Sequence, residues 1–135
     1  MRTGRAIWAF CIILLLTAAV ISIRSAPAQV ACNQTGNHLI KVSHTQGSSQ
    51  LVDCELPHIS KKAKHKITWQ ASGKDTLTIE FPANGNPFLN FTCQNQKSCT
   101  ADQIDPKALG QYKYTVTLTS GGTPFKEDPG VIIEQ

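Results

Sequence analysis

The chain has 135 residues, of which 41% are hydrophobic and 16% are charged, a length that suits one small domain with a targeting segment and excludes a large multidomain enzyme. The formal net charge is +4, but all three arginines lie within the first 24 residues. The remaining ten lysines and nine carboxylates give 10 − 9 = +1, which is too weak a field to attract nucleic acid.

The chain begins with a charged and then an apolar segment. Arg2 and Arg5 precede the apolar run 6–23, and the small residues 25–28 follow it. This order is typical of a secretory signal peptide spanning residues 1–28, with the mature chain beginning at Gln29. The alternative is an uncleaved membrane anchor formed by residues 6–23. Both hypotheses predict that the rest of the chain is exported, to the periplasm or the extracellular space.

Four cysteines follow the leader. They are Cys32, Cys54, Cys93 and Cys99. An even number of cysteines in an exported domain predicts disulfide bonds, and four cysteines allow three pairings. We favour Cys32–Cys54 with Cys93–Cys99, because each pair encloses a local polar loop. Zinc binding is the alternative use of four cysteines, although the chain has no C-x-x-C pair.

Apolar and polar residues alternate after residue 64, which predicts half-buried strands. The strongest predicted strands are 67–70, 77–81, 112–118 and 131–133, and weaker ones are 39–42, 50–52 and 88–92. Turn residues separate them at 72–75, 84–87, 120–122 and 128–130. The segment 101–109 is the one candidate for a helical turn after the leader.

This pattern predicts an all-β domain, a small two-sheet β-sandwich. We expect residues 29–63 to supply disulfide-tied N-terminal strands and loops. Residues 64–135 are expected to supply the main strands of the sandwich.

Several motifs after residue 66 are similar to those of a known family. Residues Gly110–Tyr114 read G-Q-Y-K-Y and precede a loop and the apolar strand 131–133. This order resembles the last two strands of the cupredoxins. Ile67–Trp69 and Leu77–Ile79 resemble the strands before and after that family's first copper ligand. The similarity covers about residues 66–135 and implies a cupredoxin-like sandwich, a Greek-key fold related in layout to Ig-like domains.

The copper ligands of the cupredoxins are missing from the matching positions. The family has a histidine just before the strand that begins here at Leu77, where this chain has Asp75-Thr76. The family's cysteine is replaced by Val116, and no Cys, His or Met occurs from Thr100 to Gln135. Blue copper needs a thiolate and two imidazoles. The resemblance therefore implies a copper-free exported domain of a bacterial type, with no cofactor.

Four histidines form a second candidate site. They are His38, His44, His58 and His65. Imidazole nitrogens bind copper and zinc, so the alternative function is a periplasmic copper or zinc carrier. Their spacings match no metal motif, and exposed structural histidines are the simpler interpretation.

A basic patch lies between the histidines and the first strong strand. Lys61, Lys62, Lys64 and Lys66 place four ammonium groups within six residues, enough to attract an acidic polysaccharide. No arginine or aromatic residue is interleaved with them. We favour a solvated loop that leads into a strand whose lysines discourage edge pairing.

No catalytic motif stands out. There is no G-x-S-x-G sequence, and the acidic pairs Asp102/Asp105 and Glu127/Asp128 fall in predicted turns. We therefore predict that the protein is not an enzyme but an exported binding or structural module of the bacterial envelope. The expected partner is another envelope protein or a polysaccharide and not a nucleic acid, and membrane contact is expected only if the leader is uncleaved.

Overall fold

The computed structural model describes residues 32–135, so the predicted signal segment 1–28 and the alternative anchor 6–23 lie outside the described residues. The described chain contains ten strands and no helix. It therefore also contains no helix that could cross a bilayer. The strands are β1 (His38–Val42), β2 (His58–Ser60), β3 (Ile67–Ala71), β4 (Thr76–Glu80), β5 (Cys93–Gln96), β6 (Ser98–Ala101), β7 (Gly110–Lys113), β8 (Thr115–Ser120), β9 (Thr123–Glu127) and β10 (Gly130–Glu134).

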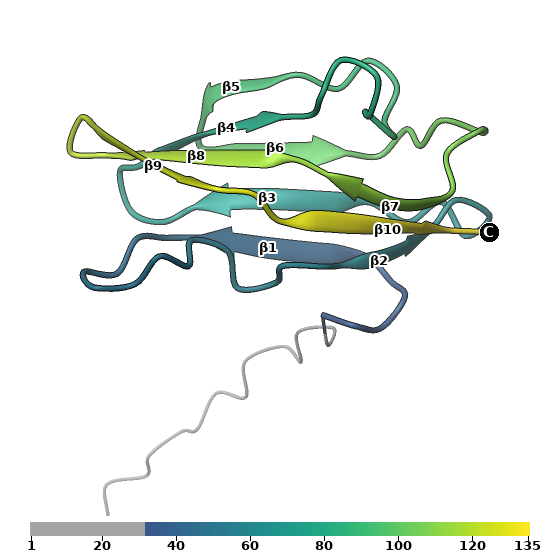
Figure 1. Ribbon diagram of the computed structural model, residues 1–135, viewed down its shortest axis with the longest axis horizontal. Helices are drawn as coiled ribbons and strands as arrows, with labels where there is room; N and C mark the ends of the chain where they lie inside the picture. Colours follow the sequence, from purple (N-terminus) through teal and green to yellow (C-terminus); the bar gives the residue numbers. More distant parts are fainter. Residues whose placement is uncertain (1–31) are drawn as a thin grey trace, which may run out of the picture.

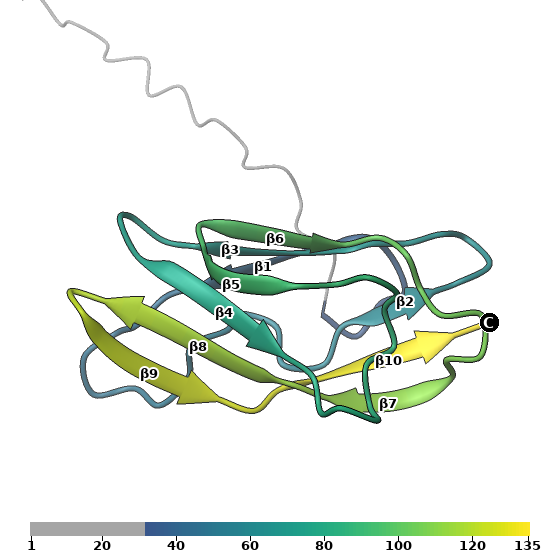
Figure 2. The ribbon, with the colours of Figure 1, turned by 90° about the horizontal axis from the view of Figure 1, so that it is seen from above.

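The strands form three sheets that pack in two layers (Figure 1 and Figure 2). One layer is the sheet β1-β3-β6, in which β1 is parallel and β6 antiparallel to β3. The other layer combines the four-stranded sheet β5-β4-β8-β9 with the three-stranded sheet β2-β10-β7. The prediction of a small all-β sandwich is confirmed, with the second layer divided between two sheets.

One long hairpin, residues 110–134, supplies strands to both sheets of the second layer. β8 pairs with β9 near its tip, and β7 pairs with β10 near its base. Tyr114 interrupts one arm and Asp128-Pro129 the other, and the Tyr114 N–H donates to the Pro129 carbonyl at 3.1 Å. The predicted strand 112–118 is therefore split at Tyr114, because the hairpin leaves one sheet for the other there (Figure 2).

The prediction of a helical turn within 101–109 is wrong. Ala101 ends strand β6, and residues 105–108 then form a single turn in which the Ala108 N–H donates to the Asp105 carbonyl at 2.9 Å. In this turn the Asp105 Oδ1 accepts the Lys107 N–H at 2.8 Å. An aspartate that bonds the backbone two residues later favours a turn over a helix.

Other strand predictions were also wrong. Segments 50–52 and 88–92 form only isolated bridges, Val42 with Val52 and Phe88 with Ile104. Strands β2, β5, β6 and β9 were not predicted, because each is short and lacks a run of alternating apolar residues. Tertiary pairing, more than local sequence pattern, determines these strands.

Trp69 and Tyr114 are the largest fully buried side chains of the core between the layers. The Trp69 Nε1–H donates to the Tyr114 hydroxyl at 3.1 Å, which links β3 in one layer to the β7–β8 junction in the other. Phe81, Phe88 and Phe91 pack around this pair with ring centroids 5.2–6.4 Å apart. Burial raises the pKa of the Tyr114 hydroxyl, so the phenol remains protonated.

Gly130 lies where the backbone of β10 approaches its neighbours closely, so that a side chain there would fit only if they moved slightly. A Cβ atom there would lie 3.0 Å from Leu56 Cδ1 and 3.1 Å from the Tyr112 carbonyl oxygen. The Gly130 N–H donates to the Glu55 carbonyl at 2.8 Å. The segment 128–130 was predicted to reverse the chain, but it leads β9 directly into β10.

The hydrogen bond between Trp69 and Tyr114 is testable by a double-mutant cycle. Tyr114→Phe leaves a buried indole N–H without an acceptor, so we expect it to lower the free energy of unfolding by about 1–3 kcal/mol. Trp69→Phe should also destabilise the protein, and the double variant should cost less than the sum, because it removes both partners. Urea unfolding of the four proteins measures these values. If the losses of unfolding free energy in the two single variants added up to the loss in the double variant, the two side chains would not be coupled.

Candidate functional site

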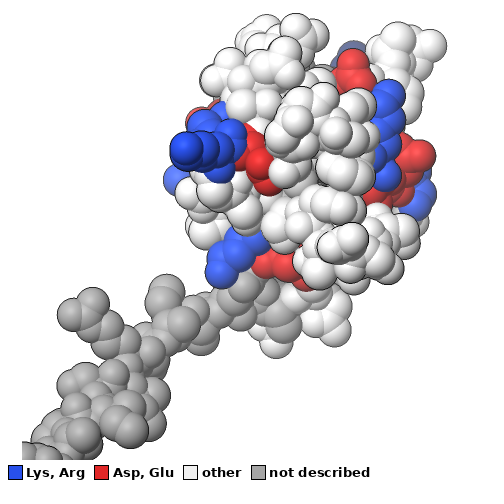
Figure 3. All heavy atoms as spheres, turned by 90° about the vertical axis from the view of Figure 1, so that its left-hand side faces the viewer, with Lys and Arg blue, Asp and Glu red and all other residues white. Residues whose placement is uncertain are grey.

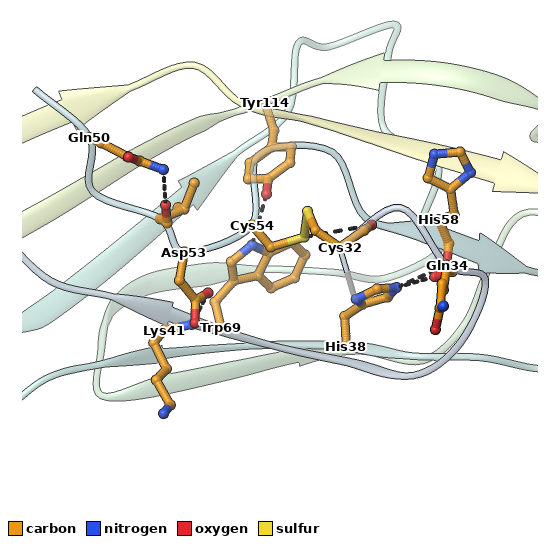
Figure 4. The surroundings of a disulfide bond; sticks show 11 residues. Cys32, Gln34, His38, Lys41, Gln50, Asp53, Cys54, His58, Trp69 and Tyr114 are labelled. Atoms are coloured by element: carbon orange, nitrogen blue, oxygen red, sulfur yellow. Dashed lines mark hydrogen bonds between the residues drawn. A yellow bond between two sulfur atoms is a disulfide. The ribbon is translucent and has the colours of Figure 1, made fainter. Parts of the chain in front are cut away.

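Two disulfide bonds hold the loops of the sandwich. Cys32 is bonded to Cys54 with 5.4 Å between the Cα atoms, and Cys93 to Cys99 with 5.8 Å. These are the two pairs favoured from the sequence. The first ties the segment before β1 to the segment before β2 (Figure 4), and the second joins β5 to β6, which belong to different layers. Disulfides persist in oxidising compartments, so the pairs indicate an exported protein.

Removing each disulfide should destabilise the protein by a different amount. The bonded cysteines are 22 residues apart in the first pair and 6 in the second. Chain entropy predicts that Cys32→Ala/Cys54→Ala costs about 3.4 kcal/mol and Cys93→Ala/Cys99→Ala about 2.4 kcal/mol. Urea unfolding of both double variants measures the difference. If the Cys93→Ala/Cys99→Ala variant lost more unfolding free energy than the other, the chain-entropy explanation would be wrong. The disulfide between β5 and β6 would then also stabilise the folded state directly.

The four histidines do not form one metal site. The His44 ring stacks on Phe125 of β9, with centroids 3.7 Å apart and an interplanar angle of 13°. His38 is buried, and its Nε2 lies 3.0 Å from the Gln34 carbonyl oxygen and 3.1 Å from that of His58 (Figure 4). Within residues 32–135, no group of three His, Cys, Asp or Glu side chains is arranged to hold a metal ion.

The other two histidines also have protein partners. The Nδ1 of His58 lies 2.8 Å from Glu134 Oε1. The Nδ1 of His65 accepts the Ser60 N–H at 3.2 Å, within the turn that joins β2 to β3. Three of the four histidines therefore contribute hydrogen bonds to the fold.

Glu134 connects the start of the described chain to its last strand. Its Oε1 meets His58, and its Oε2 accepts the Thr35 hydroxyl at 2.5 Å. These two hydrogen bonds, with Thr35 the larger influence, hold the pKa of the Glu134 carboxyl below its ordinary value of 4.5. The Ser60 hydroxyl donates to the Gln135 carbonyl oxygen. Glu134, with Thr35 and His58, therefore links the segment before β1 and strand β2 to strand β10, and we call this group the Glu134 clamp.

This clamp predicts an acid-sensitive contribution to stability. Because folding lowers the pKa of Glu134, the contribution is present above pH 4.5 and is lost as the pH falls through the lower folded value. Glu134→Gln should therefore narrow the difference between the urea midpoints at about pH 7 and about pH 3.5. Glu80→Gln, at an exposed carboxylate on β4, is the matched control. An unchanged difference in the Glu134 variant would contradict the clamp.

The predicted basic patch is only partly available to a ligand. The Lys61 Nζ donates to the carbonyl oxygens of Pro106 and Ala108, at 3.0 and 2.8 Å. Lys62, Lys64 and Lys66 are exposed. One lysine of the patch therefore anchors the 101–109 segment, and three remain on the surface.

The acidic pair Glu127/Asp128 noted in the sequence has structural partners. The Glu127 Oε2 accepts the N–H groups of Leu51 and Val52 at 2.7 and 3.0 Å. The Asp128 Oδ1 accepts the Thr115 hydroxyl at 2.7 Å. Glu127 therefore binds the segment that contains Leu51 and Val52 to the long hairpin, and Asp128 links the two arms of that hairpin.

One end of the sandwich presents a largely uncharged surface. The loop 43–50 and the hairpin tip 119–124 contain no Lys, Arg, Asp or Glu. Figure 3 faces this end and shows charged side chains mainly around the margins of an uncharged area. Electrostatic attraction therefore contributes little to any contact made here.

Two hollows open on other parts of the surface. One measures about 490 Å³ and is lined by Glu80, Phe81, Pro82, Lys113, Tyr114, Thr115 and Asp128. The other measures about 680 Å³ and is lined by Thr92, Gln94, Gln96, Ser98, Cys99 and Thr100. The sequence analysis did not single out the polar residues of the second hollow. The sequence pattern that could have indicated this hollow is the recurrence of hydroxyl and amide side chains at alternate positions around the Cys93–Cys99 pair.

Comparison of the chain with protein families and with curated proteins finds no match. Its own residues and their geometry must therefore carry any functional assignment.

Proposed function

We propose that this chain is an exported, non-enzymatic binding or structural module, a copper-free β-sandwich of the cupredoxin-like type that serves the periplasm or the cell surface. The two disulfides support export. The rigid aromatic core and the open surface hollows support a role in binding.

The positions that correspond to copper ligands carry this proposal. In the pairing of β4 with β8, Thr76 lies opposite Thr119, whereas Val116 lies opposite Ile79. Val116 is fully buried. The two positions suggested by the resemblance are therefore not neighbours, and the residue beside Thr76 offers a hydroxyl and not a thiolate or an imidazole. This donor set is foreign to blue copper.

One observation favours the alternative, a copper or zinc carrier. Among residues 32–135, the His44 Nδ1 is the single buried side-chain nitrogen or oxygen without a hydrogen-bond partner. Such a nitrogen has a lone pair or a proton available. The stacking of the ring on Phe125 and the absence of a second and third ligand beside it argue for a packed aromatic ring.

Metal titration separates the two functions. We expect the protein purified from the exported fraction to form no stoichiometric complex with Cu(II), Cu(I) or Zn(II) by calorimetry in the presence of a competing chelator. His44→Ala/His65→Ala should behave like the wild type. Tight binding by the wild type that disappears in this double variant would overturn the proposal in favour of the carrier.

A further inference from the structure

A polar groove lies where the edges of the two layers meet. β5 pairs with β4 in one layer and β6 pairs with β3 in the other, and within the described chain neither has a second partner strand. A single residue, Lys97, and the Cys93–Cys99 disulfide connect the two strands. The hollow of about 680 Å³ opens between them, and we name it the β5–β6 groove.

The lining of the β5–β6 groove is uncharged and rich in hydrogen-bonding groups. Besides Cys99 it consists of Thr92, Gln94, Gln96, Ser98 and Thr100. The one ammonium group in this run, that of Lys97, donates to the Gly73 carbonyl oxygen instead. A ligand in the groove would meet donors and acceptors but no ion.

Some of these side chains are held in place, and others retain free capacity. The Ser98 hydroxyl donates to the Trp69 carbonyl at 3.1 Å, and the hydroxyls of Thr100 and Thr68 lie 2.9 Å apart. Within residues 32–135, the side-chain amide of Gln94 has no hydrogen-bond partner. The Gln96 Nε2 donates to the Gln94 backbone carbonyl at 3.2 Å. The groove therefore combines an ordered wall with the side-chain amide of Gln94 and the remaining hydrogen-bonding capacity of Gln96.

Two large apolar side chains, Leu89 and Phe91, lie beside the groove at one end, in a hollow whose lining is otherwise mostly polar. Thr92 and Thr100 also border a smaller hollow of about 120 Å³, which Leu89 and Phe91 line. Leu89 is 45% exposed. The Phe91 ring is half-buried and packs against Trp69 with centroids 5.5 Å apart, so its position is fixed. Asp102 is the one charged residue that lines this smaller hollow.

The backbone around the groove is irregular. Asn90 and Asn95 have φ angles of 54° and 53°, a left-handed conformation that is uncommon outside glycine. The register between β4 and β5 shifts between Leu77 and Ile79, which is a β-bulge. Bulges interrupt strand pairing and redirect side chains. This irregular, short edge is a poor template for an added peptide strand.

These observations together point to a carbohydrate ligand. Sugar rings present many hydroxyl groups and an apolar C–H face, which match a neutral hydrogen-bonding wall beside Phe91 and Leu89. We propose that the β5–β6 groove binds an uncharged oligosaccharide. This inference rests on the proposed function as a binding module and names its ligand class.

The experiment titrates the full exported chain with cellotetraose and N-acetylchitotetraose, followed by amide NMR shifts and calorimetry. We expect at least one of the two to shift the amide signals of the groove residues 92–100. Gln94→Ala/Gln96→Ala should weaken this binding by about tenfold or more. Gln46→Ala, which removes an exposed amide from the loop 43–50, is the matched control and should bind like the wild type. Unchanged urea midpoints show that all the variants fold.

Each other outcome contradicts a defined part of the proposal. Failure of both sugars to bind, or binding that the double variant leaves unchanged, would overturn the groove as a sugar site while the binding-module proposal stands. Binding of only a heparin tetrasaccharide, lost in Lys62→Gln/Lys64→Gln/Lys66→Gln, would move the site to the basic patch. Mass spectrometry should recover both sugars intact, and a cleaved product would overturn the non-enzymatic function but not the groove.

Discussion

The hydrogen bond between Trp69 and Tyr114 is the interaction on which the arrangement of the two layers depends. Neither polar group can reach water, so each requires the other. The bond fixes β3 against the point where the long hairpin passes from one sheet into the next. Phe81 and Phe91 pack against this pair and also line surface hollows of about 490 and 120 Å³, so the core cluster supports part of the surface.

Apolar–polar alternation and the turn residues between strands were sufficient to predict the sandwich, because both are local properties of the sequence. Trp69 and Leu118, two of the apolar residues that alternate with polar ones in the predicted strands, are both fully buried. Strands β5 and β6 were missed because their buried positions are cysteines within a polar run. The carboxylate contacts of Glu127 and Glu134 could not be predicted, since they join residues about 75 positions or more apart.

The same limit applies to the candidate sites. The histidines and lysines are conspicuous in the sequence, but three of the four histidines and Lys61 serve the fold through hydrogen bonds with backbone groups or neighbouring side chains. The groove residues are unremarkable in the sequence, and only the meeting of two sheet edges brings them together. If the β5–β6 groove binds a ligand as proposed, recognition there depends on the spacing of neutral hydrogen-bonding groups on a rigid surface.

The pairing of β2 with β10 joins the first third of the described chain to its last residues. The Ile132 N–H donates to the Pro57 carbonyl, and Glu134 reaches Thr35 and His58. When the chain is made from its amino end, β2 therefore cannot complete its strand pairing until β10 has been made. Ile59 and the edge of β2 that faces β10 are covered only once the final strand is in place. The sheet β1-β3-β6, in contrast, has all of its strands by Ala101, so the long hairpin is the part of the chain that completes the sandwich.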